Sequence, residues 1–388
     1  MDYDLGDGAA RLRSRLRELI ASEVPAGYLG AFSEDPEDLA VAQRFCKSLA
    51  RLGLLTIAWP EAYGGAGGSL WDQTVVREEM WAHHEPRGAQ YMGLNWVGPA
   101  IMAFGTPEQK ARHLPPIAAG EVIWCQGFSE PEAGSDLAAL TTRAEPDGDG
   151  FRITGQKIWT SYAQLAQWCV LAARIGRPGE RPADKHDGIT IFLLPMDRAG
   201  IEVQPIRSML GPHHLNECFL TEVRAGRDEV LGGEGSGWTV IRRALVHERV
   251  GIARYARCDR LLSLLGDELR ARGEVLPPAL RAEWVRALIQ VRVARLLAYR
   301  AITSQGTGEP SEVAASTARL AGTRCDQDVA ELLFQAVDTR SLEDAASGGP
   351  LGGAIEDHWR YAQAATVSSG TIEVQRMIVS RALLADRP

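Results

Sequence analysis

Residues 121–161 read EVIWCQGFSEPEAGSDLAALTTRAEPDGDGFRITGQKIWTS, and this stretch decides the fold. The apolar run 122–124 is of strand type, and the turn-forming residues 129–136 cannot continue a strand. Residues 147–150, Asp-Gly-Asp-Gly, have the composition of a hairpin turn, and residues 151–155 alternate apolar and polar side chains. The pattern therefore predicts a strand at 122–124 that ends in a loop. A second strand, beginning near residue 151, should run back beside the first.

The two loops of this stretch carry hydroxyls and backbone N–H groups, and we expect them to face one crevice. Such a crevice suits a flat aromatic ligand with polar edges, because Trp159 offers a stacking face while Ser129 and Ser161 can donate hydrogen bonds. The same residues also fit a plain β-hairpin with one tryptophan in its core. The residue pattern alone leaves both interpretations open.

Three motifs resemble those of the acyl-CoA dehydrogenase family. They are Ser129-Glu130-Pro131-x-Ala133-Gly134-Ser135-Asp136, Gly155-x-Lys157-x-Trp159 and Gly370-Thr371-x-Glu373-x-Gln375-Arg376. Their order and spacing are those of the family, and the resemblance extends over nearly the whole chain. It implies an α+β fold with an N-terminal helical domain, a middle β-barrel or sandwich domain and a C-terminal four-helix bundle. It also implies that FAD binds between the last two domains.

The resemblance assigns FAD contacts to both loops and to the closing motif. The residues concerned are Gln126, Phe128, Ser129, Ser135, Trp159, Thr160, Ser161, Gly370, Thr371 and Gln375. We expect the residues at 126, 128 and 129 along one side of the isoalloxazine ring, and those at 159 and 161 at its face and N5 edge. Contacts to an acyl-CoA substrate are expected from Ser135, Ser369 and Arg249.

Length and charge narrow the classes of function. A chain of 388 residues exceeds one ordinary core, and we place domains at 1–120, 121–232 and 233–388. The chain has 42 Lys and Arg against 50 Asp and Glu, no long basic run and 7% aromatic residues, which argues against a nucleic-acid partner. Its apolar runs are short and its N-terminus is acidic, so we expect a cytoplasmic protein without membrane segments.

Metal and disulfide chemistry find little support in the sequence. The six cysteines form no Cys-x-x-Cys pair and have no histidine at ligand spacing. The histidine pairs 83–84 and 213–214 are adjacent, and neighbouring side chains on one element point apart. We therefore expect no metal site and interpret these histidines as surface or loop residues.

Apolar periodicity predicts where the helices and strands lie. Helical periods cover residues 9–24, 38–54, 71–81 and 96–104, and the Thr-Pro-Glu-Gln-Lys run at 106–110 resembles the family's start of a further helix. Residues 168–173 and 189–194 have the pattern of buried strands. From residue 233 the period is helical again, with breaks at 273–278, 306–310 and 347–353.

The catalytic base is the central question. In the family's reaction a base removes a proton from Cα while hydride leaves Cβ for the flavin, so a carboxylate is required. The family's usual base is the glutamate of an E-G-T triplet, which here reads Ser369-Gly370-Thr371. A second location known in the family is the glutamate of an E-R pair, which corresponds here to Glu248-Arg249.

The surroundings of Glu248 in the sequence agree with that role. Ile241, Leu245, Ile252 and Tyr255 form an apolar stripe at helical spacing, and Glu248 falls on the same stripe. Burial on that face raises the pKa of a carboxyl toward the range of a base at neutral pH. The alternative is a structural glutamate paired with an arginine at 242 or 249. The backbone N–H at Ser369 is still expected to hydrogen-bond the thioester carbonyl.

Two further family elements are missing. Residues 270–280 read RARGEVLPPAL, without the family's R-x-x-F-G, and residues 334–339 lack the glycines of Q-x-x-G-G-x-G. In lacking these elements, the chain resembles subunits of heteromeric dehydrogenases that act on steroid side-chain CoA esters. In those enzymes a paralogous subunit completes the site. The resemblance thus implies a branched, bulky or steroid-side-chain acyl group, a heterotetramer or homo-oligomer, and electron-transfer flavoprotein as electron acceptor. A flavin monooxygenase on the same fold and a non-catalytic subunit remain the alternatives.

Overall fold

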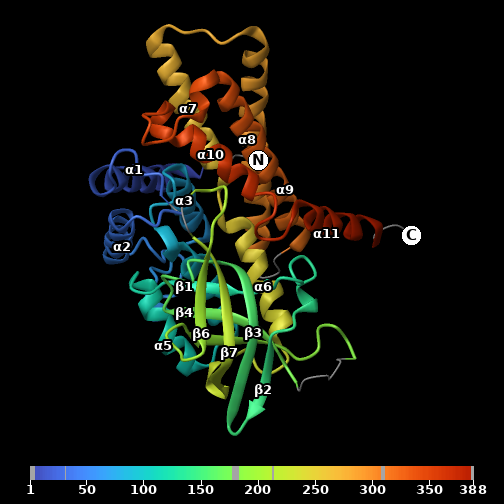
Figure 1. Cartoon of the computed structure of the whole chain (residues 1–388). Coiled ribbons are helices and arrows are strands. Elements are labelled where there is room, and N and C mark those ends of the chain that lie inside the picture. The colour runs from blue at the N-terminus through green and yellow to red at the C-terminus, as the bar shows by residue number, and fades with distance from the viewer. Residues whose placement is uncertain (1–4, 31, 177–182, 212–213, 307–310, 386–388) are drawn as a thin grey trace. The chain divides into compact units, whose positions relative to one another are not determined.

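Figure 1 shows a computed structural model of the chain, which describes residues 5–30, 32–176, 183–211, 214–306 and 311–385. Within these ranges the side chains of residues 246–251 lie outside the description. The chain forms two compact units, one of residues 32–68 and 87–247, the other of residues 1–31, 69–86 and 248–388. The predicted domain boundaries near 120 and 232 stay predictions.

The helices follow the predicted ranges. The α-helices of the described residues are α1 Gly6–Glu23, α2 Pro36–Arg51, α3 Leu70–Ala82, α4 Gly98–Phe104, α5 Pro107–Ala118, α6 Gly237–Gly251, α7 Arg254–Arg272, α8 Pro278–Gly306, α9 Glu312–Ala336, α10 Ala354–Ala364 and α11 Ile372–Ala385. The start expected at Thr106 is confirmed, because its side chain accepts from Gln109 N while the Gln109 side chain accepts from Thr106 N. The predicted break at 306–310 falls mostly outside the described residues.

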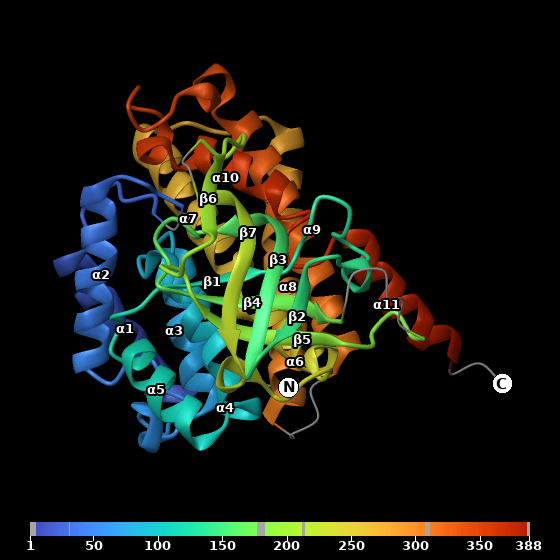
Figure 2. The same ribbon diagram turned by 60° about the horizontal axis from the view of Figure 1, so that its bottom comes forward.

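The strands form one mixed sheet in the unit of residues 32–68 and 87–247. They are β1 Trp124–Gly127, β2 Arg143–Asp147, β3 Gly150–Ser161, β4 Trp168–Ile175, β5 Ile189–Pro195, β6 Ile201–Ile206, β7 Leu215–Gly226 and β8 Val230–Leu231. Their order is β6-β7-β3-β2-β4-β5-β8, with β1 parallel to β4. The predicted hairpin is confirmed, since β2 and β3 pair antiparallel around residues 147–150. In Figure 2 the long strands β7 and β3 run side by side with β4 behind them.

The apolar core of this unit lies on the inward side chains of these strands. Phe151 of β3 meets Phe192 of β5 edge-on at 5.4 Å between ring centroids. The cluster draws on β1, β3, β4, β5 and β7, and every second residue of β7 from 216 to 220 is buried. Strands of this pattern must fix their register, because a slip of one residue would expose the whole apolar set.

In the other unit, a buried carboxylate ties helices together. Glu78 of α3 is 3% exposed and accepts hydrogen bonds from the hydroxyls of Tyr255 on α7 and Tyr299 on α8, both at 2.9 Å. Arg295 of α8 and Arg13 of α1 form ion pairs with the same carboxylate. A buried charge is tolerated only when it is paired and hydrogen-bonded, and Glu78 meets both conditions.

One predicted helix is interrupted. The apolar stripe from Ile241 to Tyr255 assumed a continuous helix, but α6 ends at Gly251 and α7 begins at Arg254. Ala253 between them has a ψ of 60°, which no α-helix contains. Glycine is a poor helix former, so Gly251 is a natural place for the helix to end. The helical spacing therefore holds only up to residue 251, and it does not relate Glu248 to Ile252 or Tyr255.

A buried ion pair joins the loop after β1 to strand β3. Lys157 of β3 is fully buried, Glu130 is 4% exposed, and Lys157 Nζ lies 2.7 Å from Glu130 Oε1. The carboxylate also accepts from Thr141 N at 2.6 Å, Thr141 Oγ1 at 2.7 Å and Thr142 N at 2.9 Å. Burial by itself raises the pKa of Glu130, but the charge of Lys157 and these hydrogen bonds together lower it to about 2.

Backbone hydrogen bonds complete this junction. Lys157 Nζ donates to the carbonyl of Phe128 at 3.1 Å, and Ile158 N donates to the carbonyl of Ser129 at 2.9 Å. The loop that follows β1 and the end of β3 are thus held side by side by charge and by backbone. No apolar pair could do the same, because the lysine meets both a carboxylate and a carbonyl on the opposite loop.

Glu130→Gln is expected to lower the free energy of unfolding by about 3–5 kcal/mol, because it leaves the buried Lys157 without its counter-charge. The double variant Glu130→Gln/Lys157→Met should recover at least half of this loss, since it removes the stranded cation. Asp147→Asn is the matched control: its ion pair with Arg152 on the same hairpin is more than a third exposed on both sides, so we expect a change below about 1 kcal/mol. Urea denaturation followed by tryptophan fluorescence measures all three, and equal stability of Glu130→Gln and Asp147→Asn would contradict this account.

The same carboxylate predicts a dependence on pH. Its folded pKa of about 2 is below the ordinary value of 4.5, so its stabilisation is complete above the ordinary value and is lost as pH falls toward the folded value. Burial lowers the pKa of Lys157 from its ordinary value, but a lysine loses its charge as pH rises and not as pH falls, so it does not oppose the trend. The stability difference between wild type and Glu130→Gln should therefore shrink when urea denaturation is repeated at about pH 3 instead of about pH 5. A difference that stays constant would show that Glu130 does not carry this dependence.

Candidate active site

Trp159 is held in a conformation that bulky residues rarely adopt. Its φ is 59°, in the left-handed region, and the pairing of β3 with β7 shifts register between Lys157 and Thr160. A β-bulge of this kind changes the direction of a side chain, and the Trp159 side chain is 56% exposed. Left-handed backbone costs a non-glycine residue about 1–2 kcal/mol, so it persists only where the surroundings fix it. Here the bonds of Lys157 and Ile158 to the opposite loop provide that constraint.

The other residues predicted along the β-domain side of the ligand lie in the same two segments. Gln126 in β1 is half-buried, Phe128 is 6% exposed, and Ser129 is half-buried. Ser161 is half-buried at the end of β3, and Ser135 is exposed in the loop that follows β1. The exposed indole of Trp159 therefore stands beside segments that carry serine hydroxyls, as a flat ligand with polar edges requires.

Thr160 departs from the prediction in one respect. Its side chain is fully buried, and its carbonyl accepts a hydrogen bond from Asn216 Nδ2 of β7 at 3.1 Å. The bulge explains this. The left-handed backbone at Trp159 points the Trp159 side chain outward and the Thr160 side chain inward. A contact from Thr160 to a ligand would therefore have to come from its backbone N–H group.

The closing motif lies between α10 and α11 in the other unit. Ser369 and Gly370 have φ values of 56° and 83°, so two successive residues are left-handed. Thr371 caps α11, since its hydroxyl accepts from Val374 N at 3.3 Å. Gly370 cannot be replaced without strain, because a Cβ there would lie 2.6 Å from Gln375 Nε2 and its φ is positive.

Only the nitrogen of the Gln375 side-chain amide is hydrogen-bonded in the structure. The residue is fully buried, and its Nε2 donates to the carbonyl of Gly370 at 3.2 Å. Its Oε1 is buried without a hydrogen-bond partner. An orphaned buried acceptor is costly, and a ligand that donates an N–H or O–H group would satisfy it. This atom fits the predicted contact of Gln375 with a cofactor.

Glu248 and Arg249 belong to α6, but their side chains lie outside the described residues. Sequence reasoning, by contrast, missed the role of Lys157. The sequence could have indicated its burial, because Lys157 is an even number of residues from Phe151 and Ile153 on the same strand. Side chains at such spacing point to one face of a sheet, and all three are buried.

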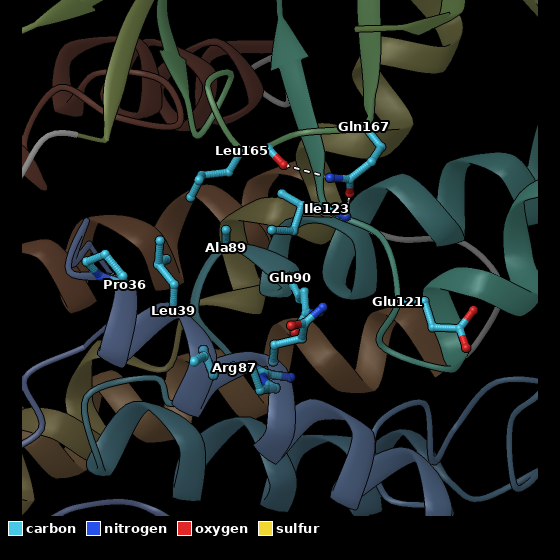
Figure 3. Close-up of a pocket in the computed structure, with 12 residues that line it drawn as sticks. Pro36, Leu39, Arg87, Ala89, Gln90, Glu121, Ile123, Leu165 and Gln167 are labelled. Atoms are coloured by element: carbon cyan, nitrogen blue, oxygen red, sulfur yellow. Dashed lines mark hydrogen bonds between the residues drawn. The ribbon is translucent and has the colours of Figure 1, made fainter. Parts of the chain in front are cut away.

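A cavity of about 350 Å³ lies in the unit of residues 32–68 and 87–247, between α2 and the segments before β1 and β4 (Figure 3). Its walls include Leu39, Gln90, Ile123 and Leu165. Gln167 at its rim accepts from Ile123 N at 2.8 Å and donates to the carbonyl of Leu165 at 2.9 Å. No residue predicted for the cofactor or the substrate lines this cavity, so we assign it no part in the reaction.

A group of metal-type ligands occurs elsewhere in the described residues. Cys258, Asp326 and His358 are fully buried, and one ligand atom of each lies within 4.8 Å of the others. Arg254 already forms an ion pair with Asp326 at 3.1 Å. Burial raises the pKa of the Cys258 thiol well above its usual value, which disfavours the thiolate that a metal needs. We therefore assign no metal to this cluster.

His214 lies in the loop before β7, as the interpretation of the histidine pairs allows, but it is buried rather than at the surface. It is 4% exposed, its ring packs against Phe32 at 4.5 Å between centroids, and its carbonyl accepts from Tyr162 N at 2.7 Å. Aromatic packing accounts for its burial. His213 lies outside the described residues.

Three family models match successive parts of the chain. The acyl-CoA dehydrogenase N-terminal domain matches residues 7–121, the middle domain residues 125–223 and the C-terminal domain residues 235–384. No helix of the described residues is long and apolar enough to cross a membrane.

Relatives agree along the whole length. The chain is 32% identical to the acyl-CoA dehydrogenase IpdE1 of Mycobacterium tuberculosis, covering 98% of this chain and 97% of that protein. It is also 32% identical to the acyl-CoA dehydrogenase FadE26 of the same organism, with 96% of each covered. Among solved structures, the Tcur3481-Tcur3483 steroid ACAD superposes with a TM-score of 0.90 at 31% identity, covering 100% of both chains. The ChsE4-ChsE5 complex from Mycobacterium tuberculosis gives 0.86 at 30% identity, again with 100% of both covered. The chain belongs to the acyl-CoA dehydrogenase family, whose α+β fold it has, and it is an oxidoreductase acting on CH–CH bonds.

Proposed function

We propose that this protein is an FAD-dependent dehydrogenase that introduces a double bond between Cα and Cβ of an acyl-CoA thioester. The observation that carries the cofactor is Trp159, whose indole is 56% exposed on a left-handed bulge that a buried ion pair fixes beside the loop of Ser129. When bound there, FAD supplies the acceptor for the hydride that leaves Cβ. Gln375 of the closing motif has an orphaned Oε1 that can accept a hydrogen bond from a ligand, which agrees with the FAD contact proposed for this residue.

Glu248 is the base of this proposal. It takes the Cα proton, and the electron pair of that C–H bond becomes the new double bond as the hydride leaves. Ser369 stands where the family's usual glutamate is found, and a serine hydroxyl cannot act as a base near neutral pH. The second known location of the base in the family, the E-R pair, is present at 248–249.

Ser369 takes part through its backbone. We place its N–H as a hydrogen-bond donor to the thioester carbonyl, which stabilises the negative charge that develops when Cα loses its proton. Ser135 and Arg249 complete the contacts proposed for the acyl-CoA. Serine is also smaller than glutamate, so the pocket next to the thioester is wider, and we propose a branched, bulky or steroid-side-chain acyl group. The name of one structural neighbour, a steroid ACAD, supports a steroid-side-chain substrate. The name of another, a two-component complex, supports assembly with a second subunit.

Assembly with a paralogous subunit is part of the proposal. The residues that end α9 lack the glycines of the family's Q-x-x-G-G-x-G turn, and Asp338 adopts a φ of 50° there, a conformation that glycine reaches at less cost. The α7–α8 connection lacks the R-x-x-F-G element as well. We therefore propose that a related chain completes the FAD site, with electron-transfer flavoprotein as the electron acceptor.

The first test is the binding of FAD. Purified protein, alone and co-expressed with the paralogous chain encoded nearest to it, is titrated with FAD while flavin fluorescence and absorbance are recorded. We expect bound FAD, with higher occupancy in the co-expressed preparation, and Trp159→Ala should weaken binding about two- to tenfold, because stacking on an aromatic face typically contributes about 0.5–1.5 kcal/mol. Trp238→Ala, in the same unit but outside the predicted site, is the matched control. Absence of flavin from every preparation would refute the proposal, and full occupancy in the chain alone would refute the need for a partner.

The second test is Glu248→Gln. The change keeps the shape of the side chain and removes only the proton acceptor, so kcat should fall by at least about 10²–10⁴-fold while FAD binding is retained. Asp267→Asn is the control, because this carboxylate on α7 is 68% exposed and pairs with Arg270 in its own helix. Turnover is measured with an artificial electron acceptor on straight, branched and steroid-side-chain acyl-CoA esters. Near-normal turnover of Glu248→Gln would assign the base to another residue or to the partner.

A further inference from the structure

Arg319 is a buried arginine that ends on backbone carbonyls. It lies on α9, is 4% exposed, and its Nη2 lies 2.8 Å from the carbonyl oxygen of Ala365 and 2.6 Å from that of Ser368. The Ser368 hydroxyl lies at 3.4 Å from the same nitrogen. Burying a guanidinium costs free energy, and these hydrogen bonds to the charged group offset part of that cost. The segment that it holds is 365–371, the connection between α10 and α11.

This connection needs to be held in place. Ser369 and Gly370 are both left-handed, and the strain at the serine persists only if neighbouring contacts fix it. Two donors from different helices do so: Arg319 binds the carbonyl of Ser368, and Gln375 Nε2 binds that of Gly370 at 3.2 Å. The carbonyls on both sides of Ser369 are therefore fixed by side chains of α9 and α11.

Peptide geometry turns this clamp into an orientation of one N–H group. In a trans peptide the N–H of a residue points opposite to the C=O of the residue before it, because the six atoms are coplanar. The carbonyl of Ser368 and the N–H of Ser369 belong to the same peptide. Because Arg319 fixes the carbonyl, the N–H of Ser369 is aimed away from Arg319. The positive charge of the Arg319 guanidinium beside this carbonyl oxygen also polarises the amide and makes that N–H a stronger donor.

We propose that Arg319 is a positioning residue that orients and polarises the Ser369 N–H toward the thioester carbonyl of the substrate. This inference rests on the proposed function, which assigns that N–H to the carbonyl. Arg319 touches neither substrate nor cofactor; it acts through the peptide of Ser368 and Ser369. Its removal should therefore affect the chemical step more than substrate binding, because the carbonyl gains negative charge only as the proton leaves Cα.

The variants are chosen to separate charge, hydrogen bonding and stability. Arg319→Met keeps an unbranched apolar stem but is shorter and removes both charge and donors, whereas Arg319→Lys keeps a charge and a donor on a side chain one atom shorter than that of arginine. Arg324→Met is the matched control: it removes an arginine from the same helix, but this side chain is 73% exposed and pairs with Asp328 one turn along. If Arg319→Met does not fold, Arg319→Gln replaces it, since it removes the charge and shortens the side chain but retains a neutral donor.

The first readout needs neither FAD nor substrate. Hydrogen–deuterium exchange of the purified chain, followed by mass spectrometry, reports the amides of residues 365–371. We expect exchange there to be about tenfold faster or more in Arg319→Met, to be close to wild type in Arg319→Lys, and to be unchanged in Arg324→Met. Unchanged exchange in Arg319→Met would overturn the inference, because it would show that Arg319 does not hold the segment.

The second readout is the split between kcat and KM, measured on the acyl-CoA ester that wild type converts fastest, such as isobutyryl-CoA or a steroid-side-chain CoA ester. We expect kcat of Arg319→Met to fall about 10²-fold with KM changed less than about threefold, and Arg319→Lys to recover most of that loss, since one oxyanion donor contributes roughly 10²–10³ in kcat. An unaltered kcat, or equal damage in the methionine and lysine variants, overturns the inference and leaves the proposed function intact. Wild type with bound FAD that converts no acyl-CoA ester overturns the proposed function itself.

Discussion

The structure of the candidate site depends on the buried ion pair between Glu130 and Lys157. Four hydrogen-bond donors converge on one carboxylate that is almost removed from water, and the lysine reaches a carbonyl of the opposite loop as well. Because each partner would be an uncompensated charge without the other, the two segments cannot separate cheaply. This constraint lets Trp159 remain left-handed, with its indole exposed, a conformation that its own backbone energetics oppose.

In the other unit, the closing motif is held by a similar arrangement with a different donor. Arg319 holds the carbonyl of Ser368 and Gln375 that of Gly370, and Ser369 between them is again left-handed. In both places a buried polar side chain fixes backbone that a loop alone would not keep. A segment that is already fixed in this way needs little ordering when a ligand binds.

Much of the fold could be predicted from local patterns. The strand, loop and hairpin of residues 121–161 follow from turn formers, which act over a few residues. The start of α5 at Thr106 was expected from the resemblance to the family, and the structure shows a capping box there. The break after Gly251 was missed, because an apolar spacing of helical period continues across it in the sequence while the backbone does not. Thr160 was expected at the ligand with its neighbours, and the bulge turned its side chain into the core. A register shift depends on the partner strand, which no local pattern specifies.

The sequence by itself determined the family and the identities of the chemical groups: the motifs around Ser129, Lys157 and Gly370, the serine in place of the usual glutamate, and the glutamate at 248. These are properties of residue type and order, which can be read without knowing the three-dimensional structure. Only the tertiary structure decided which buried charges meet. Lys157 and Glu130 are 27 residues apart, and Arg319 and Ser368 are 49 apart. Partners so distant are brought together by the packing of whole strands and helices, and the direction of a single N–H group is set by a hydrogen bond on the other side of its peptide.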